Sequence, residues 1–226
     1  ALHIWHFVES GMDSVLDGGI YWCEQKKDSK NTCSSAAGSV LALKLFIATG
    51  DILYLDQGKS LYHWTQEHLQ DSTDYLYFDH LTLDGKVCKA KYAYNSGLMM
   101  LSAVLLYQIT GEQCYLVDAQ RVAESCYQYF FSEFSSDCDS SFRLLKGGDI
   151  WFTAIMLRGF IALYKTDGNG IYLACFRSNL DYAWQHARGR KGLFSADFSG
   201  RIKDKRKWLL TQAAMVEMYA RMAAFQ

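Results

Sequence analysis

An eleven-residue pattern that occurs three times constrains the fold of this 226-residue chain more than any other feature. The copies read LFIATGDILYL, LYQITGEQCYL and LYKTDGNGIYL, and they begin at Leu45, Leu106 and Leu163. The tyrosines of successive copies are 61 and 57 residues apart. A sequence repeat of this kind marks a structural unit that buries its apolar face by stacking on its neighbours. We therefore expect an array of similar units.

The glycine inside each copy predicts the turn of a helical hairpin. Helices commonly end at a glycine, because the residue after the last turn adopts a left-handed conformation. The residue after that glycine is Asp51, Glu112 or Asn169. Its side-chain oxygen lies at or near the start of the next helix, where backbone N–H groups lack partners. Each copy is thus predicted to join two helices by a turn of two or three residues.

Apolar residues three or four positions apart predict the helices on both sides of these turns. Helices near 33–48 and 94–109 carry small or apolar residues on nearly every side, which is typical of buried helices. Helices near 52–70 and 113–134 carry more charge, so they are predicted to be outer helices. The chain should therefore alternate inner and outer helices. The expected helices span residues 1–14, 33–48, 52–70, 94–109, 113–134, 150–165, 170–188 and 207–224.

The composition agrees with an all-α fold and excludes several kinds of protein. The chain contains no proline, which an array of helices with glycine turns tolerates. Its net charge of −1 gives no electrostatic case for binding nucleic acid or an anionic membrane. The longest uncharged apolar runs, around Leu98–Ile109, are too short to span a bilayer, so no membrane-spanning segment is expected.

The seven cysteines do not have the spacing of a metal site. No pair is arranged as C-x-x-C, so neither a zinc site nor any other metal site is expected. Reduced and mostly buried thiols are the favoured interpretation. Cys23 and Cys33 could lie close together, but sequence alone does not establish a disulfide.

A closed ring of helical hairpins, the (α/α)6 toroid, is the architecture that such an array predicts. Six hairpins at this spacing need roughly 360 residues, and the chain supplies about four of them. Since it begins on an outer helix and ends on an inner one, we interpret 1–226 as a single toroid domain that lacks its N-terminal hairpins. The exposed apolar flanks of the terminal repeats would otherwise require a partner chain, self-association through these edges, or a distorted, partly closed bundle.

Four long connections carry most of the residues that suit chemistry. They span about 15–32, 71–93, 135–149 and 189–206 and are rich in Trp, Tyr, Asp, Asn and Gly. In an alternating array of helices, all long connections fall at the same end of the molecule. Functional residues concentrate in loops on a rigid scaffold, so the site is expected at that end.

Three motifs in these connections resemble glycoside hydrolase family 76, the endo-α-1,6-mannanases, and particularly its members from gut Bacteroidetes. The first is GGIYW at Gly18–Trp22, followed by Lys30-Asn31. The second is Asp84-Gly85, and the third is YAYNSG at Tyr92–Gly97. The motifs occur in the order that the family shows, and the resemblance extends from about Gly18 to the C-terminal helix.

The resemblance implies an enzyme that hydrolyses α-1,6-linked mannan or a mannose-containing oligosaccharide. It also implies a retaining mechanism, no cofactor, and a secreted, periplasmic or cell-surface location in a bacterium. The family uses two adjacent aspartates at the start of an inner helix, one as nucleophile and the other as acid and base. No Asp-Asp occurs in this chain. We therefore expect the sugar-binding part of such a site without its catalytic residues, in a fragment of a longer enzyme or in an inactive relative.

Carboxylates and amides pair with sugar hydroxyls, and aromatic rings stack on the C–H faces of sugars. By resemblance, Asp84 would bind hydroxyls of the sugar beside the cleaved bond; otherwise it is the turn residue that an Asp-Gly pair usually marks. The other candidates are weighed in the same way against loop packing, helix capping or a role in the core. They are Tyr94, Asn95, Trp22, Tyr21, Glu24, Asn31 and Trp151.

Two other functions stay open. One is a non-catalytic protein that binds glycans with the same loops. The other is an isomerase similar to the sugar 2-epimerases, which share the toroid and use histidines in its cavity. Most of the six histidines fall on predicted outer helices rather than at the starts of inner ones. That placement argues against an isomerase, although fold alone does not settle function.

Overall fold

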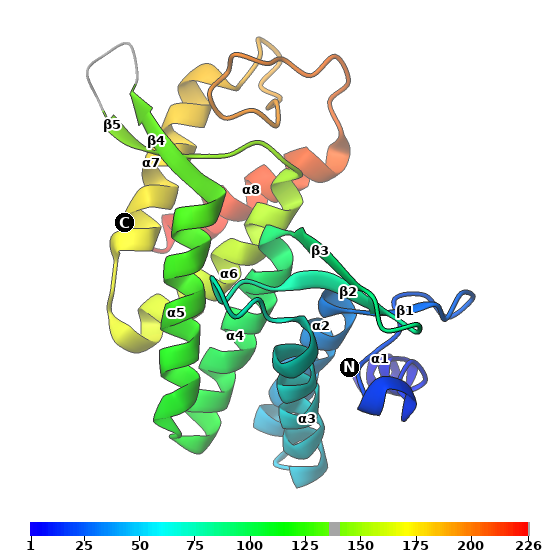
Figure 1. Cartoon of the computed structure of the whole chain (residues 1–226). Coiled ribbons are helices and arrows are strands. Elements are labelled where there is room, and N and C mark those ends of the chain that lie inside the picture. The colour runs from blue at the N-terminus through cyan, green and yellow to red at the C-terminus, as the bar shows by residue number, and fades with distance from the viewer. Residues whose placement is uncertain (136–140, 226) are drawn as a thin grey trace.

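The computed structural model describes residues 1–135 and 141–225, and helices form most of it (Figure 1). Strands occur only within the long connections, together with a short 3-10 helix at Val15–Asp17. The helices are α1 (Leu2–Glu9), α2 (Thr32–Thr49), α3 (Ile52–Leu69), α4 (Ala93–Thr110), α5 (Gln113–Phe130), α6 (Ile150–Asp167), α7 (Ile171–His186) and α8 (Leu209–Ala223). The strands are β1 (Ser29–Asn31), β2 (Phe78–Thr82), β3 (Val87–Lys91), β4 (Phe131–Ser135) and β5 (Ser141–Leu145).

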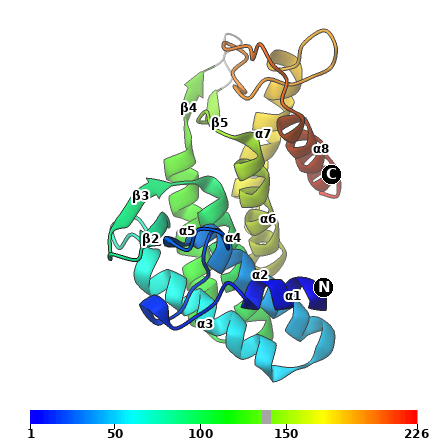
Figure 2. The same ribbon diagram turned by 90° about the vertical axis from the view of Figure 1, so that its right-hand side faces the viewer.

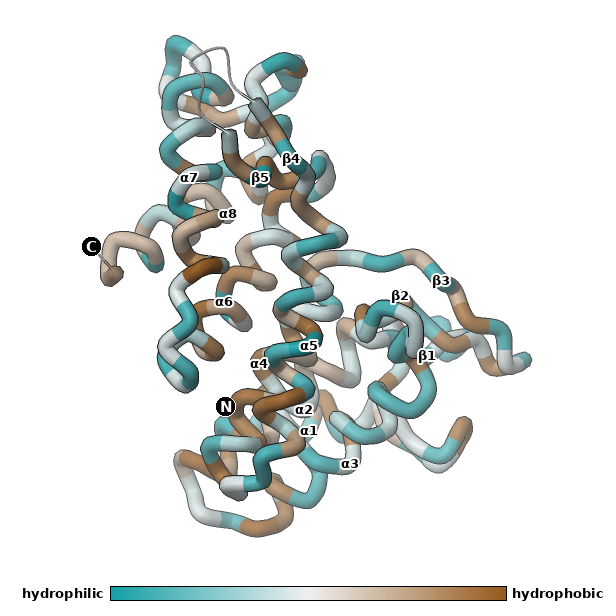
Figure 3. The backbone as a smooth tube through the Cα atoms, turned by 60° about the vertical axis from the view of Figure 1, so that its left-hand side comes forward, coloured by the Kyte–Doolittle hydropathy of each residue, from teal (hydrophilic) through white to brown (hydrophobic). Residues whose placement is uncertain are grey.

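The helices form two layers, as the repeat predicts. The inner helices α2, α4, α6 and α8 lie in a row in which each packs against the next. The outer helices α3, α5 and α7 each pack against the inner helix that precedes them in the chain, and α1 contacts α2 (Figures 1 and 2). Along the outer helices α5 and α7, hydrophilic and hydrophobic residues alternate (Figure 3). The arrangement of the helices in an inner and an outer layer is the alternation expected of a helical toroid.

The glycines that were predicted to end the inner helices do so. Gly50, Gly111 and Gly168 have φ angles of 74°, 73° and 75°. Each donates its backbone N–H to the carbonyl four residues earlier, at 2.8–2.9 Å. Asp51 caps the next helix by accepting from the N–H two residues on, whereas Glu112 makes no side-chain cap bond. In Figure 1 each of the three turns lies at the lower end of its own hairpin, and the long connections leave from the upper ends of the hairpins.

Two predicted helices extend beyond the observed ones. The helix predicted at 1–14 ends at Glu9, because the chain then turns back and Met12 pairs with Ile20 in an antiparallel bridge. The helix predicted at 113–134 ends at Phe130, because the next residues form β4 and pair with β5 in an antiparallel hairpin. In both places, contacts between segments distant in sequence decide where the helix ends.

A small antiparallel sheet joins two of the long connections. Its strand order is β1-β2-β3, so the connection before α2 is hydrogen-bonded to the one before α4. The register places Asn31 opposite His80. The sheet thereby holds the starts of two inner helices in a defined relation to the loops around them.

Helix α2 has the length and hydropathy of a membrane-crossing helix, by length and composition only. In this fold it packs against α3 and α4, and Ala36, Ala42 and Leu43 are completely buried. Its apolar character is therefore accounted for by the core. By the same measure, no other helix in the described parts of the chain is long and apolar enough to cross a membrane.

Exposed apolar side chains mark the first and last helices. Ile4 and Phe7 on α1 are largely exposed, and so are Leu209 and Val216 on α8, with 79% of Leu209 accessible. The contacts predicted at the edges of the array would use these side chains. Self-association through them stays a prediction.

The backbones of α4 and α6 touch at two glycines. A Cβ atom on Gly97 would lie only 2.4 Å from the Cα of Met156. A Cβ on Gly159 would lie 2.6 Å from the carbonyl oxygen of Gly97. A side chain at either position would therefore push the two inner helices apart.

We predict that Gly97→Ala lowers the free energy of unfolding by about 3 kcal/mol, at the upper end of the usual cost of overpacking, because the obstructing atoms belong to the backbone. Urea unfolding followed by circular dichroism measures the change. Gly147→Ala is the control, since no atom lies within 4 Å of a Cβ there, and we expect a change within about 0.5 kcal/mol. Equal stability of the two variants would contradict the close contact.

Candidate functional site

A hollow of about 430 Å³ opens at the loop end of the inner helices. Its walls come from the connection before α2, from β1 and β2, and from the starts of α4 and α6. The lining residues are Trp22, Asp28, Ser29, Asn31, Asp79, His80, Tyr92, Tyr94 and Phe152. Of the predicted site residues, the fold thus brings Trp22, Asn31 and Tyr94 together.

Asp79 is the carboxylate that faces this hollow from the sheet. It lies where the pairing of β2 with β3 shifts register, between Phe78 and His80, and such bulges commonly re-aim a side chain. Its Oδ2 is 2.8 Å from Nδ1 of His80, and its side chain is 17% exposed. Among the described residues, no lysine or arginine forms an ion pair with Asp79. Its oxygens are therefore not held by a strong cation.

Asn95 supports Asp79 from behind rather than lining the hollow. Its side chain is completely buried in the first turn of α4. Its Nδ2 is 3.5 Å from Oδ1 of Asp79, a long hydrogen bond. Its Oδ1 is buried without a hydrogen-bond partner among the described residues. The predicted residue Asn95 thus lies next to the candidate site, where it contacts Asp79, a carboxylate that the motifs did not single out.

An aromatic wall lines part of the hollow, with Tyr94 at its centre. The Tyr94 ring stacks on Tyr92 at 5.9 Å and on Trp151 at 5.5 Å between centroids. It also contacts Phe152 at 4.2 Å. Trp22, which is 65% exposed, lines the same hollow from the connection before α2. Trp151 therefore acts as a support for Tyr94, while the other rings reach the opening.

The Tyr94 hydroxyl stays protonated at any ordinary pH. Burial raises its pKa well above the usual value, and the nearby Cys33 thiol and Asp79 carboxylate raise this pKa further. A protonated phenol can both donate and accept a hydrogen bond. The Tyr94 hydroxyl is therefore a polar group within this aromatic wall.

Asp84 lies away from this hollow, at the tip of the β2–β3 hairpin. Its exposed carboxylate is 2.6 Å from the Lys86 ammonium and accepts a hydrogen bond from the Thr82 hydroxyl. The hydrogen bonds from Lys86 and then Thr82 lower the pKa of Asp84. It lines an adjoining hollow of about 420 Å³, which shares Asp28, Ser29 and His80 with the hollow around Asp79. The geometry therefore favours the turn interpretation of this Asp-Gly pair.

Tyr21 and Glu24 also lie outside the hollow around Asp79. Tyr21 is buried, with the Lys30 ammonium 4.7 Å from its ring centroid. Glu24 is exposed and lines an apolar groove of about 360 Å³ between α1 and α2, together with Trp22 and Tyr21. Of the described residues, only Trp22 borders both this groove and the hollow.

The lysine of the Lys30-Asn31 motif has a structural role. Its ammonium is completely buried and donates to the Asp13 carboxylate at 2.7 Å. It also donates to the carbonyl oxygens of Val15 at 2.7 Å and Gly18 at 2.6 Å. A buried ammonium requires such partners, because an unpaired charge in the interior is very costly. Lys30 therefore holds the loop that leads into Trp22.

A family model described as glycosyl hydrolase family 76 matches residues 1–226. The chain belongs to this family. The membership that the GGIYW, Asp-Gly and YAYNSG motifs predicted is thereby confirmed.

Individual family 76 proteins are similar to this chain to different extents. A family 76 glycoside hydrolase from a bovine Bacteroides thetaiotaomicron strain matches 100% of this chain and 50% of its own, with a TM-score of 0.95 and 35% identity. An inactive α-1,6-mannanase variant from Salegentibacter sp., in complex with α-1,6-mannotetraose, covers 100% of this chain and 68% of its own at 25% identity and a TM-score of 0.86. The mannan endo-1,6-α-mannosidase DCW1 of Candida glabrata is 32% identical over 103 residues, 42% of this chain and 23% of that protein.

The chain spans half the length of the Bacteroides structure and about a quarter of the Candida protein. The superposition on the Bacteroides structure confirms the predicted toroid type of fold. The number of hairpins in the ring stays a prediction.

In this family 76 chain, the histidines lie mostly on outer helices, as predicted. Only His80 lines the hollow. Its neighbour Asp79 and the thiol of Cys88 complete a group whose potential ligand atoms all lie within 4.8 Å of one another. The cysteines in the described residues are free thiols, including Cys23 and Cys33, while Cys138 lies outside those residues.

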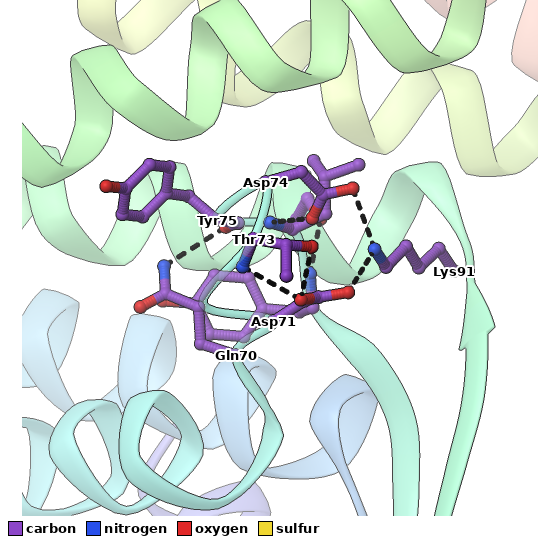
Figure 4. Close-up of polar contacts among 9 residues, drawn as sticks. Gln70, Asp71, Thr73, Asp74, Tyr75 and Lys91 are labelled. Carbon is purple, nitrogen blue, oxygen red and sulfur yellow. Dashed lines mark hydrogen bonds and ion pairs between the residues drawn. The ribbon is translucent and has the colours of Figure 1, made fainter.

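A second lysine fixes the other loop that leads into the hollow. The Lys91 ammonium donates to Asp71 at 2.6 Å and to Asp74 at 2.7 Å (Figure 4). The Asp71 carboxylate also accepts from the backbone and hydroxyl of Thr73. These contacts join the connection after α3 to the end of β3, one residue before Tyr92. The hydrogen bonds from Lys91 and Thr73 lower the pKa of Asp71 to about 2.

This lowered pKa predicts an acid-dependent loss of stability. Because the folded state holds the pKa of Asp71 below its ordinary value of 3.8, the stabilisation is complete above that value and is lost as the pH falls toward 2. We expect the unfolding free-energy difference between the wild type and Asp71→Asn to shrink by about 1–2 kcal/mol between about pH 6 and pH 2.5.

Urea unfolding at several pH values measures this difference. Asp56→Asn is the matched control, because Asp56 is an exposed aspartate on α3 that forms no ion pair with any described residue. The difference in unfolding free energy between Asp56→Asn and the wild type should not become smaller at low pH. A pH-independent difference for Asp71→Asn would contradict the assigned ion pairs.

Proposed function

We propose that this chain forms the mannan-binding face of a family 76 protein that hydrolyses α-1,6-linked mannan. The observation that carries the proposal is the position of Asp79, a carboxylate that lines the hollow with a wall of aromatic rings and has no lysine or arginine partner in the described parts of the chain. Family membership supports the substrate class. So does the Salegentibacter relative, whose inactive variant is in complex with α-1,6-mannotetraose.

The residues of the hollow suit a mannose ring. A carboxylate accepts hydrogen bonds from two adjacent hydroxyls, and charged acceptors make the stronger hydrogen bonds. Asp79 supplies that acceptor, and His80 and Asn95 hold it in place. The rings of Tyr92, Tyr94 and Phe152 offer apolar faces to sugar C–H groups. Polar contacts on one side and aromatic contacts on the other orient a sugar between them.

The hydrolytic step is assigned to a pair of adjacent aspartates, and the 226 residues contain no such pair. By the family resemblance the reaction retains the anomeric configuration. One carboxylate attacks the anomeric carbon, and the other protonates the leaving oxygen and then activates water. The contribution proposed for this chain is sugar binding beside the cleaved bond. Release of reducing ends from α-1,6-mannan by the protein distinguishes a hydrolase from a non-catalytic glycan-binding relative.

Calorimetric titration with α-1,6-linked mannotetraose tests the binding role. We expect saturable heat from the wild-type chain. Asp79→Ala should weaken binding at least about 10-fold, because a hydrogen bond to a charged group contributes about 1.5–3 kcal/mol. Asp84→Ala should leave the affinity within about 2-fold, since Lys86 already holds that carboxylate at the exposed hairpin tip.

The two variants form a matched pair, because each removes one aspartate from the same hairpin. Circular dichroism of both confirms that they are folded. If Asp84→Ala abolished binding and Asp79→Ala did not, the sugar would lie at the hairpin tip and the proposed site would be wrong. Absence of heat from the folded wild type would contradict binding by this chain on its own.

A further inference from the structure

Three side chains at the edge of the hollow have the donors of a metal site. Asp79 offers a carboxylate oxygen, His80 a ring nitrogen and Cys88 a thiol sulfur. All three potential ligand atoms lie within 4.8 Å of one another, and all three residues are half-buried. Among the described residues no other group of this kind occurs.

The hairpin geometry brings these residues together. His80 and Cys88 are directly paired across the antiparallel strands β2 and β3. Side chains of neighbouring residues in a regular strand point to opposite faces. The register shift between Phe78 and His80 breaks this rule, and the carboxylate of Asp79 lies 2.8 Å from the imidazole of His80. The bulge therefore adds a third donor to a cross-strand pair.

The set of donors fits zinc better than other common ions. Zn²⁺ takes thiolate, imidazole and carboxylate ligands in tetrahedral geometry, whereas Ca²⁺ and Mg²⁺ prefer oxygen ligands alone. Ligand atoms around tetrahedral zinc lie about 3.3–3.8 Å apart. Side-chain movements of about 1 Å would therefore bring the three potential ligand atoms to the separations found around zinc. Since Asp79 and His80 line the hollow, a fourth position can be filled by water.

We propose that Asp79, His80 and Cys88 bind Zn²⁺, and that bound zinc withdraws Asp79 from sugar binding. On binding, the Cys88 thiol loses its proton to solvent and its sulfur bonds to zinc, while His80 and Asp79 give lone pairs without a change of oxidation state. The thiolate and carboxylate together neutralise the two charges of the ion. The second half of the proposal, competition with sugar, rests on the proposed function of the same hollow.

Titration of the reduced, metal-free chain with Co²⁺ and Zn²⁺ tests the site without any glycan. Cobalt bound by a thiolate gives a charge-transfer band in the near ultraviolet, which carboxylates and imidazoles do not give. We expect one such band that saturates at one equivalent and disappears when Zn²⁺ is added. Calorimetry should show one zinc site, weakened at least about 10-fold by Cys88→Ser.

Cys114→Ser is the matched control, because Cys114 is an exposed thiol on α5, away from the hairpin. It should keep both the band and the zinc affinity. His80→Gln gives a second test that leaves the thiol in place, and it should weaken zinc binding while circular dichroism stays unchanged. A band that persists in Cys88→Ser, or a wild-type chain without a band, would overturn the site.

Mannotetraose titrations with and without one equivalent of Zn²⁺ test the competition. Zinc should lower the sugar affinity of the wild type at least about 10-fold, as the loss of Asp79 itself would. The same zinc concentration should lower the sugar affinity of Cys88→Ser much less, because that variant binds zinc more weakly. Equal affinity of the wild type in both conditions would refute the competition. If the wild type bound no mannotetraose at all, the proposed function would fail, while the cobalt and zinc titrations would still decide the metal site.

Discussion

The contact between the backbones of α4 and α6 at Gly97 and Gly159 determines where the candidate site can form. Because these helices touch without intervening side chains, their N-terminal turns lie side by side. That proximity allows Tyr94 at the start of α4 to stack on Trp151 at the start of α6, with centroids 5.5 Å apart. If a methyl group lay between the two helices, these two rings would be moved apart. The aromatic wall is therefore a consequence of core packing, in which small shifts are costly.

Two lysines fix the loops on either side of that wall. Lys30 is completely buried and binds the Asp13 carboxylate and backbone carbonyls of the preceding loop. Lys91 joins Asp71 and Asp74 to the end of β3. Each ammonium is surrounded by enough acceptors to offset its loss of hydration. The loops are thus held by these ion pairs in addition to apolar packing, in which Ile20, Leu76 and Tyr77 are buried. A site whose loops are already ordered loses less entropy when a ligand binds.

Local patterns predict the helices well, because each signal lies within a few residues of the feature it marks. The three turn glycines are examples, and so are the apolar sides of α2 and α4. The strands were missed because pairing of β2 with β1 and β3 depends on residues distant in sequence. The candidate site shows the same limit. Trp22 and Tyr94 follow from motifs, whereas Asp79 enters the hollow through a register shift that no local pattern marks.

Asp79 and Asp84 show that one hairpin can carry two carboxylates in different surroundings, of which the visible motif marks only Asp84. Asp-Gly is conspicuous because a turn requires it, and the same turn brings Lys86 within 2.6 Å of Asp84. The Lys86 ammonium therefore occupies one side of the Asp84 carboxylate, in an ion pair whose two side chains are largely exposed. Asp79 has only His80 as an ionic partner among the described residues. The oxygens of Asp79 are therefore left without a strong cation, a property that only the fold reveals.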